Sequence, residues 1–162
     1  MKETVYLEST VISYYTSKPS RDIIIYAHQQ LTKDWWEASQ KEYQFYVSEI
    51  VIEEISRGNK EEARKRLEFV SEIPVLDLTD DIERIAGIYA EKLSIPDRAF
   101  GDALHLATAC VHKIDYLITW NCKHLANAHV IKNLGNVNQE LGIHNTIICT
   151  PEELMVGEEN GH

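Results

Sequence analysis

Four oxygen-bearing side chains lie at or shortly after the ends of apolar runs in this chain of 162 residues: Glu8, Glu54, Asp102 and Asn121. Glu8, for example, comes directly after the run 5–7. Three of the four are carboxylates and one is an amide, and hard cations such as Mg²⁺ and Mn²⁺ prefer oxygen ligands. If the runs are parallel strands, such ligands gather at their carboxyl ends. The pattern predicts a divalent-cation site that acts on phosphates, with nucleic acid as the expected substrate.

Taken singly, most of these residues are ordinary. A lone Glu at a strand end is usually solvated, and Glu53 with Glu54 alone would indicate an exposed helix face. Asp102 differs, because the spacing of Ala103 and Leu106 sets it at the border of an apolar helix face. An isolated buried charge is costly, so this carboxylate requires a partner or a metal ion.

Apolar strand-like runs alternate with helical patterns along the chain. Thr10 or Ser9 is expected to cap the first helix, and Pro151 to open a last short one. The alternation predicts a three-layer α/β/α fold with a central parallel sheet of four to five strands. Strands are predicted at 5–7, 45–47, 75–78, 116–119 and 146–149. Helices are predicted at 9–17, 21–43, 49–56, 61–70, 79–93, 96–111, 130–141 and 151–154.

Length and composition favour one domain over residues 1–156, followed by a disordered tail at 157–162. No apolar run approaches the length of a transmembrane helix, and no signal peptide is evident at the start. A cytoplasmic location without membrane contact is expected. Cys110 and Cys149 fall in apolar patterns typical of reduced core cysteines.

The chain has 16 basic and 26 acidic residues and a net charge of −10, which is unusual for a protein that binds phosphates. The acidity can serve solubility on exposed helices. It can also include a carboxylate cluster that needs cations and a surface suited to a basic partner. A nucleotide-binding domain with a glycine-rich phosphate loop is disfavoured, because residues 8–11 after the first strand contain no glycine.

Four motifs occur in order along the chain: Tyr6-Leu7-Glu8-Ser9-Thr10, Glu54-Ile55 followed by Arg57-Gly58, Asp102-Ala103-Leu104-His105-Leu106-Ala107-Thr108-Ala109, and Thr119-Trp120-Asn121. Together they resemble the motifs of the PIN domain family, and more narrowly those of the VapC-like ribonucleases of bacterial toxin–antitoxin pairs. The resemblance covers residues 5–154. It implies a PIN-like fold and a metal-dependent endoribonuclease that hydrolyses phosphodiester bonds of single-stranded RNA.

The resemblance also implies the site. Glu8, Glu54 and Asp102 would hold Mg²⁺ or Mn²⁺, and Asn121 would orient water or phosphate. Two positions depart from the family pattern: Glu8 stands where Asp is usual, and Asn121 stands where Asp is common. The amide keeps an oxygen but no charge, so the site has three formal negative charges and a second metal ion is disfavoured.

Further residues are candidates for contacting RNA. Thr10 and Thr119 would bind the phosphate or fix the carboxylates, with capping and turn formation as the alternative role. Lys18, Arg21 and Lys123 are candidates for the RNA backbone, whereas His124 is expected at the surface or in a structural role. Four aromatic residues could include a base-stacking platform. Of these, Trp35 is expected in the core and Trp36 at the surface or an interface, with Tyr14 and Tyr15 as the others.

The expected partners are an RNA substrate, a second copy of the chain and an antitoxin protein encoded nearby. A homodimer follows from the resemblance and from apolar area at Tyr14, Tyr15 and Trp36, unless the tyrosines fill the domain's own core. A basic antitoxin segment would complement the negative charge. The alternative is a non-catalytic PIN-like module that binds nucleic acid or protein, which the Asn121 departure keeps open.

Overall fold

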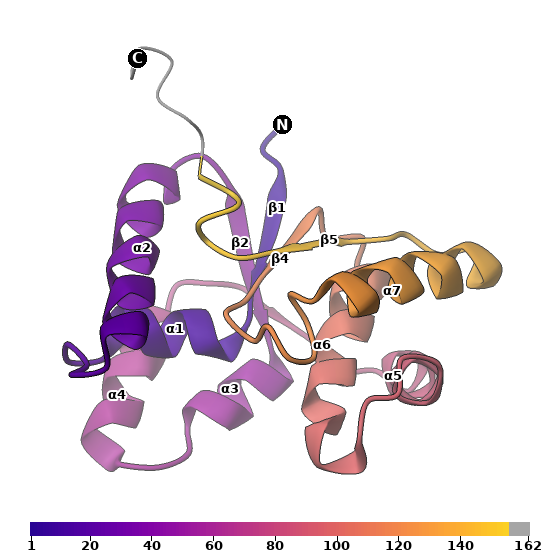
Figure 1. Cartoon of the computed structure of the whole chain (residues 1–162), viewed down its shortest axis with the longest axis horizontal. Helices are drawn as coiled ribbons and strands as arrows, with labels where there is room; N and C mark the ends of the chain where they lie inside the picture. The colour runs from indigo at the N-terminus through magenta and orange to yellow at the C-terminus, as the bar shows by residue number, and fades with distance from the viewer. Residues whose placement is uncertain (156–162) are drawn as a thin grey trace.

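A five-stranded parallel sheet forms the centre of the computed structural model, which describes residues 1–155 (Figure 1). Its order is β3-β2-β1-β4-β5, so β1 is central, with β2 and β4 as its neighbours. Leu7 is paired with Ile118, and the Glu8 amide donates to the Ile118 carbonyl at 3.1 Å. The ends of β1 and β4 therefore lie side by side. The strands are β1 (Thr4–Leu7), β2 (Gln44–Ser48), β3 (Val75–Leu76), β4 (Tyr116–Ile118) and β5 (Ile147–Cys149).

Helices cover both faces of this sheet. They are α1 (Ser9–Thr16), α2 (Ile23–Ser39), α3 (Glu49–Ile55), α4 (Lys60–Phe69), α5 (Asp80–Lys92), α6 (Phe100–Val111) and α7 (Ala128–Leu141). Helix α1 packs against α2 and α4, whereas α5 packs against α6 and α7, on the other side of the sheet (Figure 1). Helix α3 contacts α1, α4 and α6, so it bridges the two groups. The predicted three-layer α/β/α fold is confirmed, with five strands.

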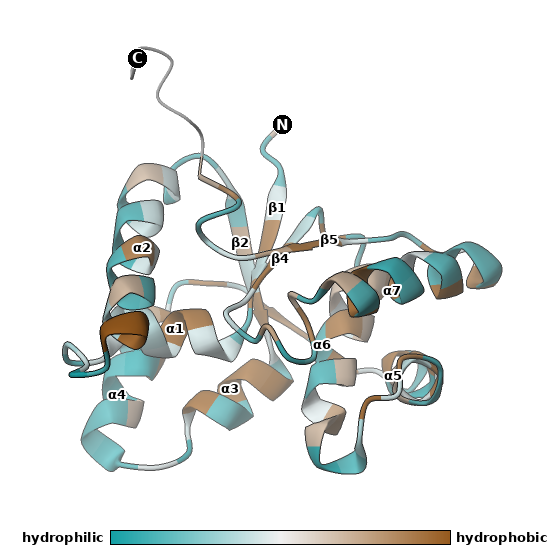
Figure 2. Ribbon diagram, viewed as in Figure 1, coloured by the Kyte–Doolittle hydropathy of each residue, from teal (hydrophilic) through white to brown (hydrophobic). Residues whose placement is uncertain are grey.

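The strands are mostly apolar because helices cover both faces of the parallel sheet. Val5, Tyr6 and Leu7 are fully buried. Figure 2 shows apolar residues along the strands, whereas α4 is mostly hydrophilic. Cys110 and Cys149 are buried and free, as predicted. No helix within residues 1–155 has the length and apolar character needed to cross a bilayer.

Several element boundaries differ from the predicted ones. Strand β3 is only two residues long, and α6 is preceded by a 3₁₀ turn, Asp97–Ala99. The predicted helix at 151–154 is wrong, because these residues form a single hydrogen-bonded turn. Thr150 and Glu153 exchange side chain to backbone hydrogen bonds there, at 2.9 and 3.3 Å. The expected tail at 157–162 lies outside the described residues.

The predicted cap of α1 is also wrong. Neither Ser9 nor Thr10 caps the helix; Glu8 does, by accepting a hydrogen bond from the Thr10 amide at 3.1 Å. A carboxylate at this position accepts a hydrogen bond from an amide that has no partner within the helix, and its charge interacts favourably with the positive end of the helix dipole. The cap therefore fixes Glu8 directly at the end of β1.

One of the four aromatic residues, Trp36, packs differently from the expectation. Trp35 is fully buried, as predicted. Trp36 is partly buried rather than exposed, with its ring 4.8 Å from Phe45 and 4.9 Å from Phe69. Tyr15 lies against the same Phe69 ring at 4.6 Å. These rings fill the space between α1, α2 and α4 and do not form an open platform.

Candidate metal centre

Glu8 is held at the end of β1 by three hydrogen bonds to one oxygen. Its Oε1 accepts from the Thr10 amide at 3.1 Å, the Thr10 hydroxyl at 2.5 Å and the Thr119 hydroxyl at 2.7 Å. The side chain is almost entirely buried. Burial raises the pKa of Glu8 above its usual value, although His105 and the threonine hydrogen bonds oppose the shift. Thr10 and Thr119 thus fix a carboxylate that would otherwise be poorly solvated.

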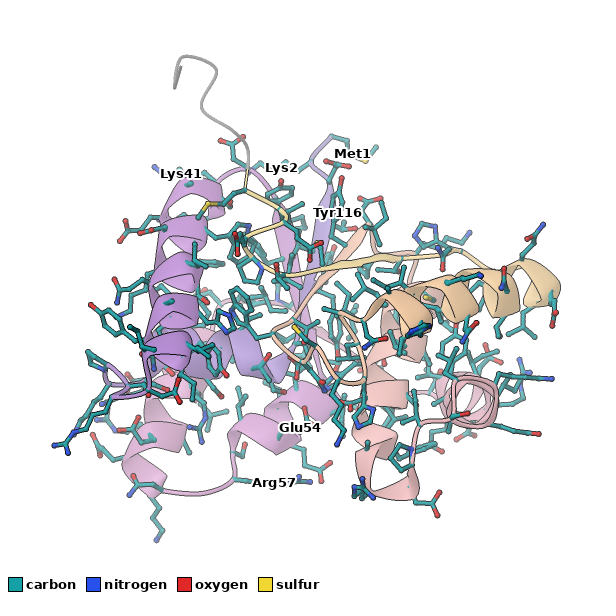
Figure 3. The ribbon with its side chains drawn as sticks, viewed as in Figure 1. Met1, Lys2, Lys41, Glu54, Arg57 and Tyr116 are labelled. Atoms are coloured by element: carbon teal, nitrogen blue, oxygen red, sulfur yellow. The ribbon has the colours of Figure 1, made fainter. Side chains whose placement is uncertain are left out.

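Glu54 reaches the same place from α3. Its Oε1 accepts from the Ser9 hydroxyl at 2.5 Å and from His105 Nε2 at 2.7 Å. Burial tends to raise the pKa of Glu54, but the hydrogen bond and charge of His105, with Ser9, lower it overall. The adjacent Glu53 instead pairs with Arg57 at 2.6 Å in an exposed position. Figure 3 places Glu54 between the two groups of helices and Arg57 at the outer edge of the molecule.

His105, on α6, completes this group. A carboxylate oxygen of Glu8, a carboxylate oxygen of Glu54 and a ring nitrogen of His105 all lie within 4.8 Å of one another. The His105 side chain is fully buried. Burial lowers the pKa of His105, but the hydrogen bond and charge of Glu54, with the charges of Glu8 and Asp102, outweigh this and raise it. The ring therefore lies in a strongly negative environment.

Asp102 lies one turn before His105 on α6. Burial raises the pKa of Asp102, and the nearby charge of Glu54 adds to that effect, while His105, Asn121 and His124 oppose it. The Asn121 side chain lies near this carboxylate and acts to lower its pKa. Its own Oδ1 accepts from the Lys123 and His124 amides at 3.2 and 3.0 Å. The Asn121 oxygen thus closes the turn after β4, and its amide group faces Asp102.

The donor set fits a hard divalent cation. In the part of the chain that the structure describes, the hydrogen bonds to Glu8 and Glu54 all converge on Oε1, and none reaches Oε2 of either residue. Each glutamate therefore keeps one oxygen without a protein hydrogen bond. The third residue whose ligand atom lies within 4.8 Å of both is His105, whereas Asp102 is related to Glu54 only through the effect of the Glu54 charge on its pKa. Mg²⁺ typically binds one or two carboxylates and retains several waters.

The proposed RNA-backbone contacts are not brought to this cluster. Arg21 is exposed in the segment before α2, and Lys123 is exposed after Asn121. Within residues 1–155, no hydrogen bond or salt bridge joins either side chain to the carboxylates. Their role in binding RNA stays a prediction.

Comparison with known proteins identifies the family. No curated protein matches the chain in sequence. A family model described as "PIN domain" matches residues 5–124, which include all four motif positions. The chain belongs to the PIN domain family.

Solved structures share the fold of this PIN domain. VapBC2 from Rickettsia felis, bound to a DNA fragment from its promoter, has a TM-score of 0.57 at 18% identity, covering 91% of this chain and 98% of that chain. VapC20 from Mycobacterium tuberculosis, a toxin that cleaves the sarcin–ricin loop, has a TM-score of 0.56 at 15% identity, covering 70% and 86%. A toxin–antitoxin complex from Klebsiella pneumoniae has a TM-score of 0.55 at 20% identity, covering 74% and 88%.

Sequence reasoning missed three members of the PIN domain site: Ser9, His105 and Tyr6. Ser9 and His105 both lie inside the motifs that mark the site, but their types are common at helix starts and on helix faces. A usable signal was the spacing of His105 three residues after Asp102, which places both on one side of a helix.

Gly101 offers a direct test of the Glu54 position in this PIN domain. A Cβ at Gly101 would lie 3.0 Å from Glu54 Oε2. Gly101→Ala is expected to favour the helix by up to about 1 kcal/mol and yet to weaken divalent-metal binding, because Glu54 is held by two hydrogen bonds and must shift. Calorimetric metal titration and thermal unfolding measure the two effects.

Gly87→Ala is the matched control for that substitution. Gly87 lies in α5, and a Cβ there meets nothing within 4 Å. It should give the same small gain in stability with unchanged metal affinity. Equal metal affinity in both variants would show that Glu54 Oε2 does not face the ion.

Proposed function

We propose that this PIN domain is a divalent-metal-dependent endoribonuclease that cleaves single-stranded RNA and serves as the toxin of a toxin–antitoxin pair. The observation that carries the proposal is the convergence of Glu8 and Glu54, each with one oxygen free of protein hydrogen bonds, on the same α6 helix that carries Asp102 one turn before His105. Membership of the PIN domain family and the fold shared with VapC toxins support the reaction class.

In this proposal Glu8, Glu54 and Asp102 hold Mg²⁺ or Mn²⁺. A bound ion there would lower the pKa of a coordinated water and offset the charge that develops on the phosphate. Thr10, Thr119 and Ser9 keep the two glutamates in place through the hydrogen bonds described above. Asn121 keeps the turn after β4 closed and its amide group beside Asp102, so its contribution is to orient that carboxylate.

A cleavage assay tests the proposal. The purified protein should cut single-stranded RNA with Mg²⁺ or Mn²⁺ and lose that activity when a chelator is added. Cleavage that persists after chelation and metal-free dialysis would contradict metal dependence. Metal-independent RNA binding without any cleavage would favour the alternative, a non-catalytic PIN-like module.

The proposed partners are a basic antitoxin segment and a second copy of the chain. The net charge of −10 favours a basic partner. For the homodimer, the exposed apolar area lies at the start of α2 (Figure 2), where Ile23 and Ile24 are 81% and 65% exposed, and not at the partly buried Tyr15 and Trp36. Co-purification with the product of the adjacent gene and light scattering of wild type and Ile24→Lys test the two partners.

A further inference from the structure

A buried chain of hydrogen bonds runs through the core to Glu54. Ser48 Oγ lies 2.7 Å from the Tyr6 hydroxyl, which lies 2.6 Å from His105 Nδ1. His105 Nε2 lies 2.7 Å from Glu54 Oε1. Ser48, Tyr6 and His105 are all fully or almost fully buried. They come from β2, β1 and α6, so the chain of bonds links the sheet to both helices that flank the site.

The direction of these bonds follows from their two ends. An ionised carboxylate only accepts hydrogen bonds, so His105 Nε2 must carry a proton and donate it to Glu54. In the neutral ring Nδ1 then accepts from the Tyr6 hydroxyl, which in turn accepts from Ser48. At the far end Ser48 Oγ accepts from the Val51 amide at 3.4 Å, which is the cap of α3. Ser48 thus donates to Tyr6, Tyr6 donates to His105, and His105 donates to Glu54.

This arrangement selects one oxygen of Glu54. Oε1 accepts from both His105 and Ser9, whereas Oε2 has no protein hydrogen bond and lies next to Gly101, where an added Cβ would be 3.0 Å away. Without His105, Ser9 alone would hold Oε1, and the carboxylate would have more freedom to rotate and offer either oxygen. The ring also supports Glu54 without occupying the position of a ligand, because a protonated Nε2 has no lone pair for a metal ion.

We propose that His105 is a positioning residue that, through its Nε2 proton, ties down Glu54 Oε1 and presents Oε2 alone to a divalent cation. Ser48 and Tyr6 fix the orientation and proton arrangement of the His105 ring. The inference rests on the proposed metal-dependent function. It assigns His105 a functional role, the positioning of a metal ligand, in addition to its packing in the core. Its rival is direct coordination of the ion by Nε2.

Two substitutions at His105 separate the two ring nitrogens. In His105→Gln the side-chain amide can reach the Nε2 position and still donate to Glu54. In His105→Asn the shorter amide reaches only the Nδ1 position, so it can bind Tyr6 but not Glu54. His105→Asn should weaken Mn²⁺ affinity about 10-fold or more, as is usual for the loss of a group that orients a metal ligand. His105→Gln should recover most of that loss.

Mn²⁺ titration by calorimetry and electron paramagnetic resonance provides the affinities, with melting temperatures of the metal-free proteins recorded alongside. His112→Asn, at an exposed position after α6, is the control and should bind as wild type does. Equal affinities for the Asn and Gln variants of His105, at comparable melting temperatures, would overturn the positioning role.

Nitrogen-15 spectra of the His105 ring in the wild-type protein decide the question even if the variants fail to fold. A proton on Nε2 that persists when Mg²⁺ is added supports positioning, whereas its loss on adding Mg²⁺ would establish direct coordination and overturn the proposal. If wild type binds no divalent ion, the metal-dependent function fails. The metal-free spectrum then still tests the bond to Glu54, since an unprotonated Nε2 would exclude it.

Discussion

Replacing Glu54 with Gln is expected to reduce RNA cleavage by at least about 100-fold, the range seen when one preorganised electrostatic group is lost from a reacting centre. The hydrogen bonds from Ser9 and His105 require an acceptor at the Oε1 position, so the carbonyl oxygen of Gln should take that place. Its NH₂ group must then stand where Oε2 stood and point at the cation. Cleavage rates at saturating Mg²⁺ measure the effect.

Glu53→Gln is the matched control for this prediction. It lies beside Glu54 on α3 and makes the same chemical change, but Glu53 is exposed and pairs with Arg57. Exposed pairs of this kind contribute little to stability, so cleavage and melting temperature should stay close to those of wild type. Similar losses in both variants would mean that the charge of the helix, and not the Glu54 position, determines activity.

Metal-free protein should become more stable as the pH falls from 8 to about 5. The pKa values of Glu8 and Asp102 are raised in the folded state, so their unfavourable contribution is relieved as the pH falls through those values. The raised pKa of His105 acts in the same direction, because its stabilising effect is lost as pH rises through the folded value. Glu54, with a lowered pKa, opposes this only below its usual value of about 4.3.

Divalent ions should remove most of that pH dependence by stabilising the protein at high pH. An ion at 100 times its dissociation constant adds about 2.7 kcal/mol, which corresponds to roughly 5–10 °C in melting temperature for a chain of this size. Thermal unfolding at pH 8 and pH 6, with chelator or with millimolar Mg²⁺ or Mn²⁺, measures both effects.

In the metal-free protein, Glu8→Gln should reduce the change in melting temperature between pH 8 and pH 6, whereas Glu53→Gln should leave that change as it is in wild type. A flat profile in wild type, with no shift on adding metal, would refute this account of the cluster.

Much of the fold was predictable because local signals agreed with one another. The strands of a sheet covered on both faces are mostly apolar, and Asn59 and Thr79 cap α4 and α5 as residues of their types commonly do. Residues 151–154 show where such signals fall short. Proline and two glutamates there match a helix start, and Thr150 and Glu153 exchange the hydrogen bonds of a capping box. One turn is expensive to nucleate without further packing, and the chain forms only a turn.

For the site, the sequence indicated that Glu8 and Glu54 come together, but not that His105 joins them or how each side chain is held. The position of Glu8 after β1 and of Glu54 on α3, the helix after β2, follows from parallel-sheet geometry. The donors that hold them come from residues far away in sequence: Thr119 lies 111 residues from Glu8, and His105 lies 51 from Glu54. Such pairings depend on the register of β1 with β4 and the packing of α3 on α6, which no local pattern encodes. The hydrogen bonds that the Asn121 oxygen accepts from two backbone amides were likewise not predicted.

Because both glutamates have one oxygen bound by protein donors, each can act only as a monodentate ligand. A cation held in this way receives few protein atoms and must complete its shell with water or with substrate oxygens. Mg²⁺ and Mn²⁺ tolerate such a sparse shell, whereas Ca²⁺ draws on six to eight oxygens and commonly on bidentate carboxylates. In the proposed site, the hydroxyl groups of Ser9, Thr10 and Thr119 and the ring of His105 would thus favour the smaller ions: by holding one oxygen of each carboxylate, they would disfavour Ca²⁺ and leave exchangeable positions for an RNA substrate.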